Sequence, residues 1–185
     1  MPLGAALLIL ATIIIGSFYN YSQTRMNRET AMQINSVAGL FKEELKNDTH
    51  LMSGLIDFLK VDPCLQRYFQ ARDRAALLLC AAPIFEQMYS QHRVTHFYFH
   101  TPARINFLRV HNVVRHGDVI DRITMQGAFN SGSPFSGIEL GLLGTLTLRT
   151  VHPWYLNGEL IGYIELGEEI GHITNNRLLD VLAAY

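Results

Sequence analysis

The sequence has few of the residues and motifs that most metalloproteins and enzymes carry. Its 185 residues include only two cysteines, Cys64 and Cys80, and their spacing matches neither a zinc ligand set nor a CxxC redox motif. The chain contains no nucleophile elbow, HExxH, P-loop or paired-glycine fingerprint. We therefore predict that the protein is not an enzyme and needs no cofactor.

Charge of either sign is also sparse. The net charge is −1, only 17% of residues are charged, and the basic residues are scattered, so nothing in the electrostatics favours a nucleic-acid partner. A hydrophobic content of 49% lies in the globular range, and the length after the N-terminal segment suits one domain. The composition predicts a globular domain without nucleic-acid binding.

The two cysteines allow two interpretations. If the domain is exported, Cys64 and Cys80 could pair, because an oxidising compartment preserves disulfides. Buried free thiols on helices are the other interpretation, and the sequence favours this one.

Eight histidines raise the question of a metal site. His96 and His100 are four residues apart on a predicted strand, about 13 Å along it, which is too far to chelate one ion. His111 and His116 flank a loop and could meet, with His152 joining them. Without cysteines or clustered carboxylates, each histidine is better interpreted as a hydrogen-bonded pocket or surface residue, and no metal is predicted.

The N-terminal segment is uncharged and apolar. Residues 3–19 just reach the length of a spanning helix, so residues 1–20 are predicted to form a transmembrane anchor. A cleaved signal peptide is the alternative, but the basic n-region and a small-residue cleavage site are missing. Arg25 and Arg28 follow the segment and by themselves weakly favour a cytoplasmic location for those residues.

Residues 21–60 are predicted to form a long stalk helix. Apolar residues recur at three- and four-residue spacing from Ile34 to Leu59, which suits packing on a sheet and pairing with a second copy, hence a homodimer. Asp62-Pro63 ends this helix, and Asp73 is expected to cap another that runs to about Tyr89.

Two predicted strands, 94–100 and 105–111, follow these helices. Alternation puts His96, Tyr98 and His100 on one face of the first strand, and Ile105, Phe107, Arg109 and His111 on one face of the second. Residues 121–129 are predicted to be a short helix, and 136–140 and 145–155 are predicted strands. Such a polar aromatic face could be the floor of a ligand pocket or a plain solvated surface.

Asn157-Gly158 is the preferred pair for a two-residue hairpin turn. Counting outward from this turn puts His152 opposite Tyr163 and Thr150 opposite Glu165, so that these residues, with Trp154, share one face. Residues 61–167 would then form one α+β domain with about five antiparallel strands. A last helix over 168–185 completes the prediction.

A small organic ligand suits these polar faces better than a metal does. Arg109 is the predicted anchor for a carboxylate, although a structural ion pair with Glu165 or Asp118 would serve equally well. Glu165 could accept the amino group of an amino acid or could pair with Arg109. The predicted ligand-binding residues are Tyr98, His100, Arg109, His111, His152, Trp154, Tyr163 and Glu165.

The run HFYFHTPARINFLRVHNVVRHGDVIDR and the later run SGIELGLLGTLTLRTVHPWYLNGELIGYIELGEEI resemble the Cache superfamily of extracytoplasmic sensor domains. Within it, the resemblance over residues 96–170 is to the double-Cache type of bacterial chemoreceptors, histidine kinases and diguanylate cyclases. It implies a PAS-like sheet braced by a long N-terminal helix. It also implies a periplasmic sensor for amino acids or carboxylates, anchored in the inner membrane by the first of two membrane helices.

The chain departs from that family in two ways. Only one sheet can be found where double-Cache members have two modules, and neither a second membrane helix nor a cytoplasmic output domain is present. The sequence is therefore expected to be part of a larger receptor, truncated before the second membrane helix. Ligand binding would bias the packing of the exit helix against the stalk helix. The alternative is a ligand-free dimerisation or protein-docking module.

Overall fold

The computed structural model describes residues 2–141 and 144–171. The chain divides into two compact units, residues 1–43 and residues 44–185. The described part of the first unit, residues 2–43, belongs entirely to helix α1 (Pro2–Val61). No helix among the described residues is both long and apolar enough to cross a membrane. Part of the predicted anchor over residues 1–20 lies outside this description, and the anchor stays a prediction.

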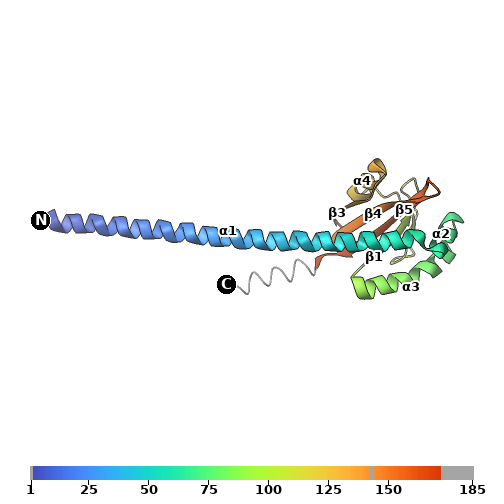
Figure 1. The fold of residues 1–185 in the computed structure, drawn as a ribbon, viewed down its shortest axis with the longest axis horizontal. Helices are drawn as coiled ribbons and strands as arrows, with labels where there is room; N and C mark the ends of the chain where they lie inside the picture. Colours follow the sequence, from blue (N-terminus) through green and yellow to red (C-terminus); the bar gives the residue numbers. More distant parts are fainter. Residues whose placement is uncertain (1, 142–143, 172–185) are drawn as a thin grey trace. The chain divides into compact units, whose positions relative to one another are not determined.

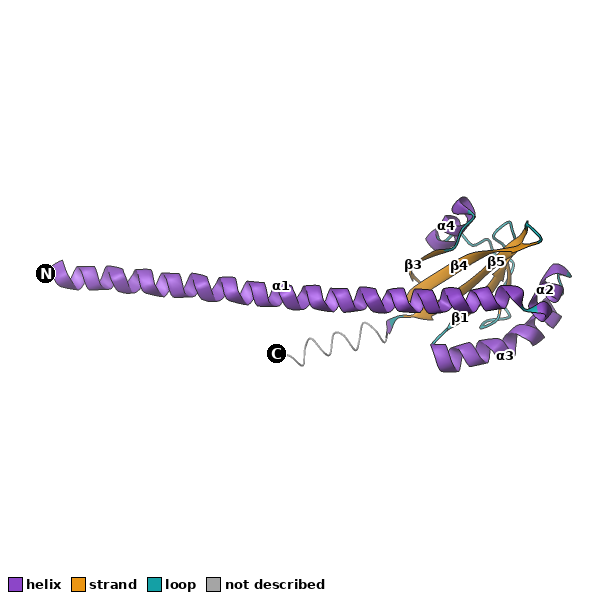
Figure 2. Cartoon of the chain, in the orientation of Figure 1, coloured by secondary structure: helices purple, strands orange, loops and turns teal. Residues whose placement is uncertain are grey.

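The second unit is a five-stranded sheet with helices on both faces (Figure 1; Figure 2 shows the same elements by type). After α1 its elements are, in chain order, α2 (Pro63–Gln70), α3 (Arg74–His92), β1 (His96–His100), β2 (Asn106–Arg109), α4 (Ile123–Ser131), β3 (Phe135–Leu140), β4 (Leu146–Leu156) and β5 (Glu159–Glu169). The strand order is β2-β1-β5-β4-β3, and all neighbouring pairs are antiparallel. The predicted α+β class with a PAS-like sheet is confirmed.

Two aspartates start the helices that follow α1. The Asp62 carboxylate accepts the Leu65 N–H at 2.9 Å at the start of α2, and the Asp73 carboxylate accepts the Ala76 N–H at 3.0 Å at the start of α3. Each satisfies a backbone donor that the first helical turn leaves unpaired. The sequence-based prediction that Asp73 caps a helix is confirmed.

The end of α1, with α2 and α3, covers one face of the sheet. Met52 and Ile56 of α1 are buried there, and Phe69 of α2 stacks on Trp154 of β4 with ring centroids 5.0 Å apart. The Trp154 indole N–H donates to the Lys60 carbonyl at 3.0 Å, so the ring is buried without losing its hydrogen bond. This apolar layer fixes the position of the sheet against the helices.

Cys64 and Cys80 form a disulfide between α2 and α3, with Cα atoms 6.2 Å apart. The interpretation of buried free thiols is therefore wrong. The sequence could not decide this, because pairing requires that α2 reverse direction onto α3, and no strong pattern predicted α2. A disulfide agrees with an oxidising compartment.

The hairpin at Asn157-Gly158 forms as predicted, with Leu156 opposite Glu159. A β-bulge between Trp154 and Tyr155 then shifts the register by one residue. Beyond it, Val151 lies opposite Glu165 and His152 opposite Ile164, so the predicted pairings His152–Tyr163 and Thr150–Glu165 are wrong.

The consequence is a change of face. His152 and Trp154 point toward the helices α1 and α2, whereas Tyr163 and Glu165 point to the opposite side of the sheet. A second bulge, between Phe99 and His100 of β1, brings Asn106 opposite His100, and Phe107 packs against Phe69 on the helical side instead of sharing a face with Arg109.

β5 also runs further than predicted. It continues through Glu169, two residues into the segment that the sequence assigned to the exit helix. Glu168 is buried and accepts a hydrogen bond from Arg93 Nε at 2.8 Å, an interaction that favours the extended backbone over a new helix. Residues 172–185 of that predicted helix lie outside the described residues.

Candidate functional site

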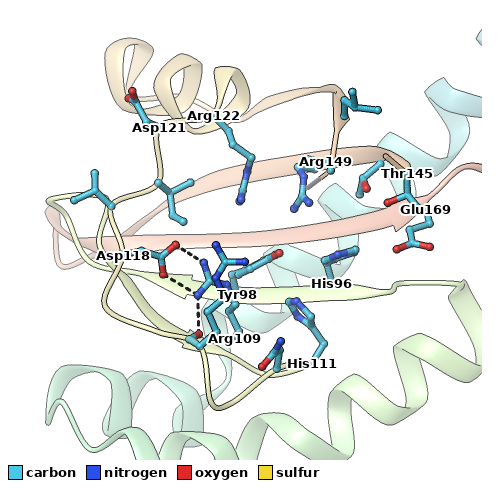
Figure 3. A pocket seen from close by; sticks show the side chains of 17 residues that line it. His96, Tyr98, Arg109, His111, Asp118, Asp121, Arg122, Thr145, Arg149 and Glu169 are labelled. Carbon is cyan, nitrogen blue, oxygen red and sulfur yellow. Dashed lines mark hydrogen bonds and ion pairs between the residues drawn. The ribbon is translucent and has the colours of Figure 1, made fainter. Parts of the chain in front are cut away.

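A cavity of about 460 Å³ lies on the α4 side of the sheet (Figure 3). His96 and Tyr98 from β1 and Arg149 from β4 form part of its floor, while Asp118 and Arg122 enter from the segment between β2 and α4. Two further arginines, 109 and 115, line it as well. The cavity is thus lined by more arginines than any other residue type, whereas the opposite face of the sheet packs Trp154 against the helices.

Arg109 is held by Asp118. Its two terminal nitrogens donate to the two Asp118 oxygens at 2.8 and 2.6 Å, and Nη1 also donates to the Arg115 carbonyl at 2.6 Å (Figure 3). The hydrogen bonds from Arg109 lower the pKa of Asp118 to about 2, against the opposing effect of burial. The structural ion pair, one of the two roles left open by the sequence, is therefore present with Asp118, and it ties the loop after β2 to the floor.

A second charged cluster surrounds Glu165, which is completely buried. Arg122 Nη2 donates to both carboxylate oxygens at 2.5 and 2.6 Å, Arg149 Nη1 donates to Oε1 at 2.7 Å, and His100 Nε2 lies 3.0 Å from Oε2. Burial alone would raise the pKa of Glu165, but Arg122, His100 and Arg149 together hold it well below its usual range. Glu165 is thus an anion that orients two guanidinium groups beside the cavity.

Tyr98 connects the two clusters. Its ring lies 5.3 Å from the guanidinium carbon of Arg122, 5.6 Å from that of Arg109 and 5.7 Å from that of Arg149. At these distances each cation is attracted by the ring face. The tyrosine ring therefore adds to the attraction by which Asp118 and Glu165 hold the three arginines close together.

Two neutral histidines lie beside these arginines. His96 and His111 meet edge to face with ring centroids 4.7 Å apart, and burial, reinforced by nearby arginines, lowers the pKa of His96 to about 3 and that of His111 to about 4. The Phe97 backbone N–H donates to His111 Nδ1 at 3.2 Å, so the ring proton of a neutral His111 is assigned to Nε2. The imidazoles are thus uncharged hydrogen-bonding groups at neutral pH.

One hydroxyl at the cavity wall has no hydrogen-bond partner among the described residues. It is Oγ1 of Thr147, a residue that is completely buried and lines the cavity from β4. A buried hydroxyl without a partner costs about 1–3 kcal/mol relative to a satisfied one. A bound polar molecule would satisfy it.

The structure separates the eight sequence-predicted site residues into three groups. Tyr98, Arg109 and His111 line the cavity, while His100 and Glu165 lie buried next to its arginines. The other three do not line it.

Tyr163 belongs to an apolar cluster under α4 with Ile120, Met125, Ala128 and Val151. His152 and Trp154 lie on the helical face, where His152 contacts Ser53 and Lys60 of α1. His152 and Trp154 were predicted on the pocket face because the count from the hairpin turn did not include the bulge between Trp154 and Tyr155.

The cavity-lining residues that sequence reasoning left out of the predicted site include His96, Arg122, Thr147 and Arg149. His96 had been assigned to the correct face by strand alternation, so that signal was available. Arg149 would have been found by placing a bulge before the hairpin turn. Arg122 falls inside the predicted helix 121–129, but α4 begins only at Ile123, and no pattern in the sequence indicates where the Arg122 side chain points.

Among the described residues, no three His, Cys, Asp or Glu side chains converge as a metal ion would require. The cavity wall carries four arginines beside Asp118, Asp121 and Glu169, and guanidinium groups donate hydrogen bonds rather than bind cations. Its chemistry therefore suits a small molecule with hydrogen-bond acceptors.

A long helix on one face of a five-stranded antiparallel sheet, with a polar cavity on the other, is the architecture of a PAS-like Cache sensor domain. The family described as the double sensory domain of two-component sensor kinases matches residues 32–177, and the chain belongs to this family. No curated protein matches the chain by sequence.

Three solved structures share the fold. The sensor domain of Escherichia coli DcuS is 17% identical, with a TM-score of 0.60 over 71% of this chain and 95% of that one. A sensory box/GGDEF family protein domain from Vibrio parahaemolyticus is 16% identical (TM-score 0.58; 75% of this chain, 60% of that one). The sensor domain of the Vibrio cholerae histidine kinase DctB is 15% identical (TM-score 0.52; 74% and 58%). The chain thus spans about 60% of the length of the two Vibrio structures, and at these identities the likeness concerns the fold alone.

Proposed function

We propose that the chain is the extracytoplasmic sensor domain of a membrane-bound bacterial receptor and that its cavity binds a small anionic metabolite with a carboxylate group. The observation that carries this proposal is the group of three arginines, 109, 122 and 149, held around Tyr98 at the cavity floor. Membership in a family of sensor domains supports it. Guanidinium groups already positioned by the carboxylates of Asp118 and Glu165 can receive an anion without losing further side-chain entropy.

The disulfide supports the extracytoplasmic location, because such bonds persist in oxidising compartments such as the bacterial periplasm. The transmembrane anchor over residues 1–20 is part of the proposal. So is a homodimer through α1, whose Met32 and Ile34 are exposed in the single chain. A cytoplasmic output domain would belong to the larger receptor.

β5 offers a route by which occupancy of the cavity could reach α1. Glu165 contacts the cavity arginines, and three residues further along the same strand Glu168 accepts a hydrogen bond from Arg93 Nε at 2.8 Å. Arg93 Nη2 lies 3.3 Å from the Asp48 carboxylate of α1. We propose that a ligand which moves Arg122 or Arg149 shifts β5 and, through Arg93, the position of α1.

The experiment is a thermal-unfolding screen of the whole 185-residue chain in detergent against small carboxylates, with phosphate and sulfate as reference anions. A true ligand at a hundred times its Kd adds about 2.7 kcal/mol of stability and raises the melting temperature by several degrees. Arg122→Ala should abolish that shift, because it removes a guanidinium that is partly open to the cavity.

The matched control is Arg67→Ala, an exposed arginine of α2 outside the cavity, which should keep the full shift. A melting temperature that no carboxylate and no reference anion changes would contradict the proposal. It would favour the alternative, a ligand-free dimerisation or docking module.

A further inference from the structure

We propose that the cavity selects a carboxylate whose second polar group is a hydroxyl or keto oxygen and rejects the corresponding amino acid. This inference rests on the proposed function, since it names the ligand class of the same cavity. It follows from three observations: the hydrogen-bond partners of the carboxylates, the neutral form of the histidines, and the buried hydroxyl of Thr147.

An amino acid needs an acceptor for its ammonium group, and Glu165 cannot supply one. The sequence had suggested this role for it. Glu165 is completely buried, and its two oxygens already receive Arg122, Arg149 and His100. An ammonium group would have to displace a guanidinium group, which would leave a buried charge without its partner.

The other carboxylates at the cavity are also occupied. Both oxygens of Asp118 bind Arg109. Asp121 accepts from Arg104 at 3.2 Å and from Gln126 at 2.7 Å, both at Oδ1, and its side chain is 73% exposed, so water screens its charge. Glu169 stands at the exposed rim, where water screens its charge, and it is engaged as well. No carboxylate of the described cavity wall is therefore both buried and without a guanidinium partner.

The arginines at the cavity also act against the ammonium group of an amino acid. Arg149 and Arg109 add to burial in keeping His96 and His111 neutral, as their lowered pKa values show. The same guanidinium groups disfavour an ammonium group that enters the cavity, just as they disfavour a protonated imidazole of His96 or His111.

The uncharged groups favour an oxygen instead. Neutral His111 carries its proton on Nε2, since Nδ1 accepts the Phe97 N–H. The Thr147 hydroxyl is buried at the wall without a hydrogen-bond partner among the described residues. A hydroxyl or keto oxygen next to the carboxylate could accept from these donors, whereas an ammonium group has no lone pair to accept them.

The test is calorimetric titration of the whole chain with matched pairs that differ only in this group: glycolate and glycine, lactate and alanine, 2-oxoglutarate and glutamate. The oxygen member of at least one pair is expected to bind at least ten-fold more tightly than its amino partner. Amino members that bind equally or better would overturn this inference and leave the proposed function standing. Absence of binding by every compound, and by phosphate, would overturn both.

Thr147→Val supplies an independent check, because it removes the hydroxyl at nearly constant shape. The oxygen member should bind roughly two- to ten-fold more weakly to this variant, as expected for one lost hydrogen bond. Thr147→Ser, which keeps the hydroxyl, is the matched control and should retain the affinity. An unchanged affinity of Thr147→Val would overturn the part assigned to this hydroxyl.

Discussion

Replacing Glu165 with glutamine would keep the shape of the side chain and remove the negative charge that Arg122, Arg149 and His100 share. Breaking a buried ion pair by neutralising one partner typically costs about 3–5 kcal/mol. Glu139 Oε2, which lies 3.2 Å from Arg122 Nε and 3.4 Å from Arg149 Nε, would offset part of this loss. We therefore expect a loss of about 3 kcal/mol in the free energy of unfolding, near the lower end of that range.

Urea unfolding followed by far-UV circular dichroism measures this loss. For a domain of this size the melting temperature should fall by about 10 °C. Added salt should restore little of it, because the cluster is buried and poorly screened. Glu159→Gln, an exposed position at the start of the same strand, is the control and should change stability by less than about 0.5 kcal/mol.

A loss below about 1 kcal/mol for Glu165→Gln would refute the reasoning. It would mean that the two arginines find full compensation elsewhere and that Glu165 does not position them.

Three further outcomes are expected. Reduction of the disulfide between Cys64 and Cys80, which are 16 residues apart, should lower the free energy of unfolding by about 3 kcal/mol, and the reductant should have no such effect on a variant with both cysteines replaced by alanine. Gly162→Ala should destabilise by more than about 1 kcal/mol in urea, because its Cβ would overlap the His100 carbonyl and the Phe69 ring, whereas Gly54→Ala, with open space around it in α1, should gain up to about 1 kcal/mol. Burial lowers the pKa of His152 to about 4, below its unfolded value of 6.5, so the stability that neutral His152 contributes is complete above pH 6.5 and is lost as the pH falls from 6.5 to 4. The free energies of unfolding of the wild type and of His152→Asn should therefore converge over that window. A difference between them that stays constant with pH would contradict this.

Local patterns predicted much of the fold correctly. The alternation in β1 placed His96, Tyr98 and His100 on one face, and all three lie on the cavity side of the sheet. The Asn157-Gly158 pair predicted the hairpin and its first pair of opposed residues. These features depend on neighbouring residues, whose preferences act within a few positions along the chain.

The candidate site was predicted only in part, because a single bulge reverses the faces of a strand. The register counted outward from the turn was right up to Tyr155, and the bulge beside Trp154 then moved His152 to the helices and Arg149 to the cavity. Burial of Trp154 against Phe69 and Lys60 favours this arrangement, and both partners are more than 80 residues away in the sequence. A count from the turn contains no information about them.

The amino-acid sequence by itself determined which segments form most of the strands, the hairpin turn and the capped helix α3, because those preferences arise from backbone sterics and from the alternation of apolar side chains. It also placed an arginine, a tyrosine and histidines on neighbouring strands. Only the tertiary structure decided which of them face the cavity, that Arg122 reaches Glu165, and that Cys64 meets Cys80. Those outcomes depend on packing between segments far apart in the chain, where the burial of one aromatic ring or one charge outweighs a local preference.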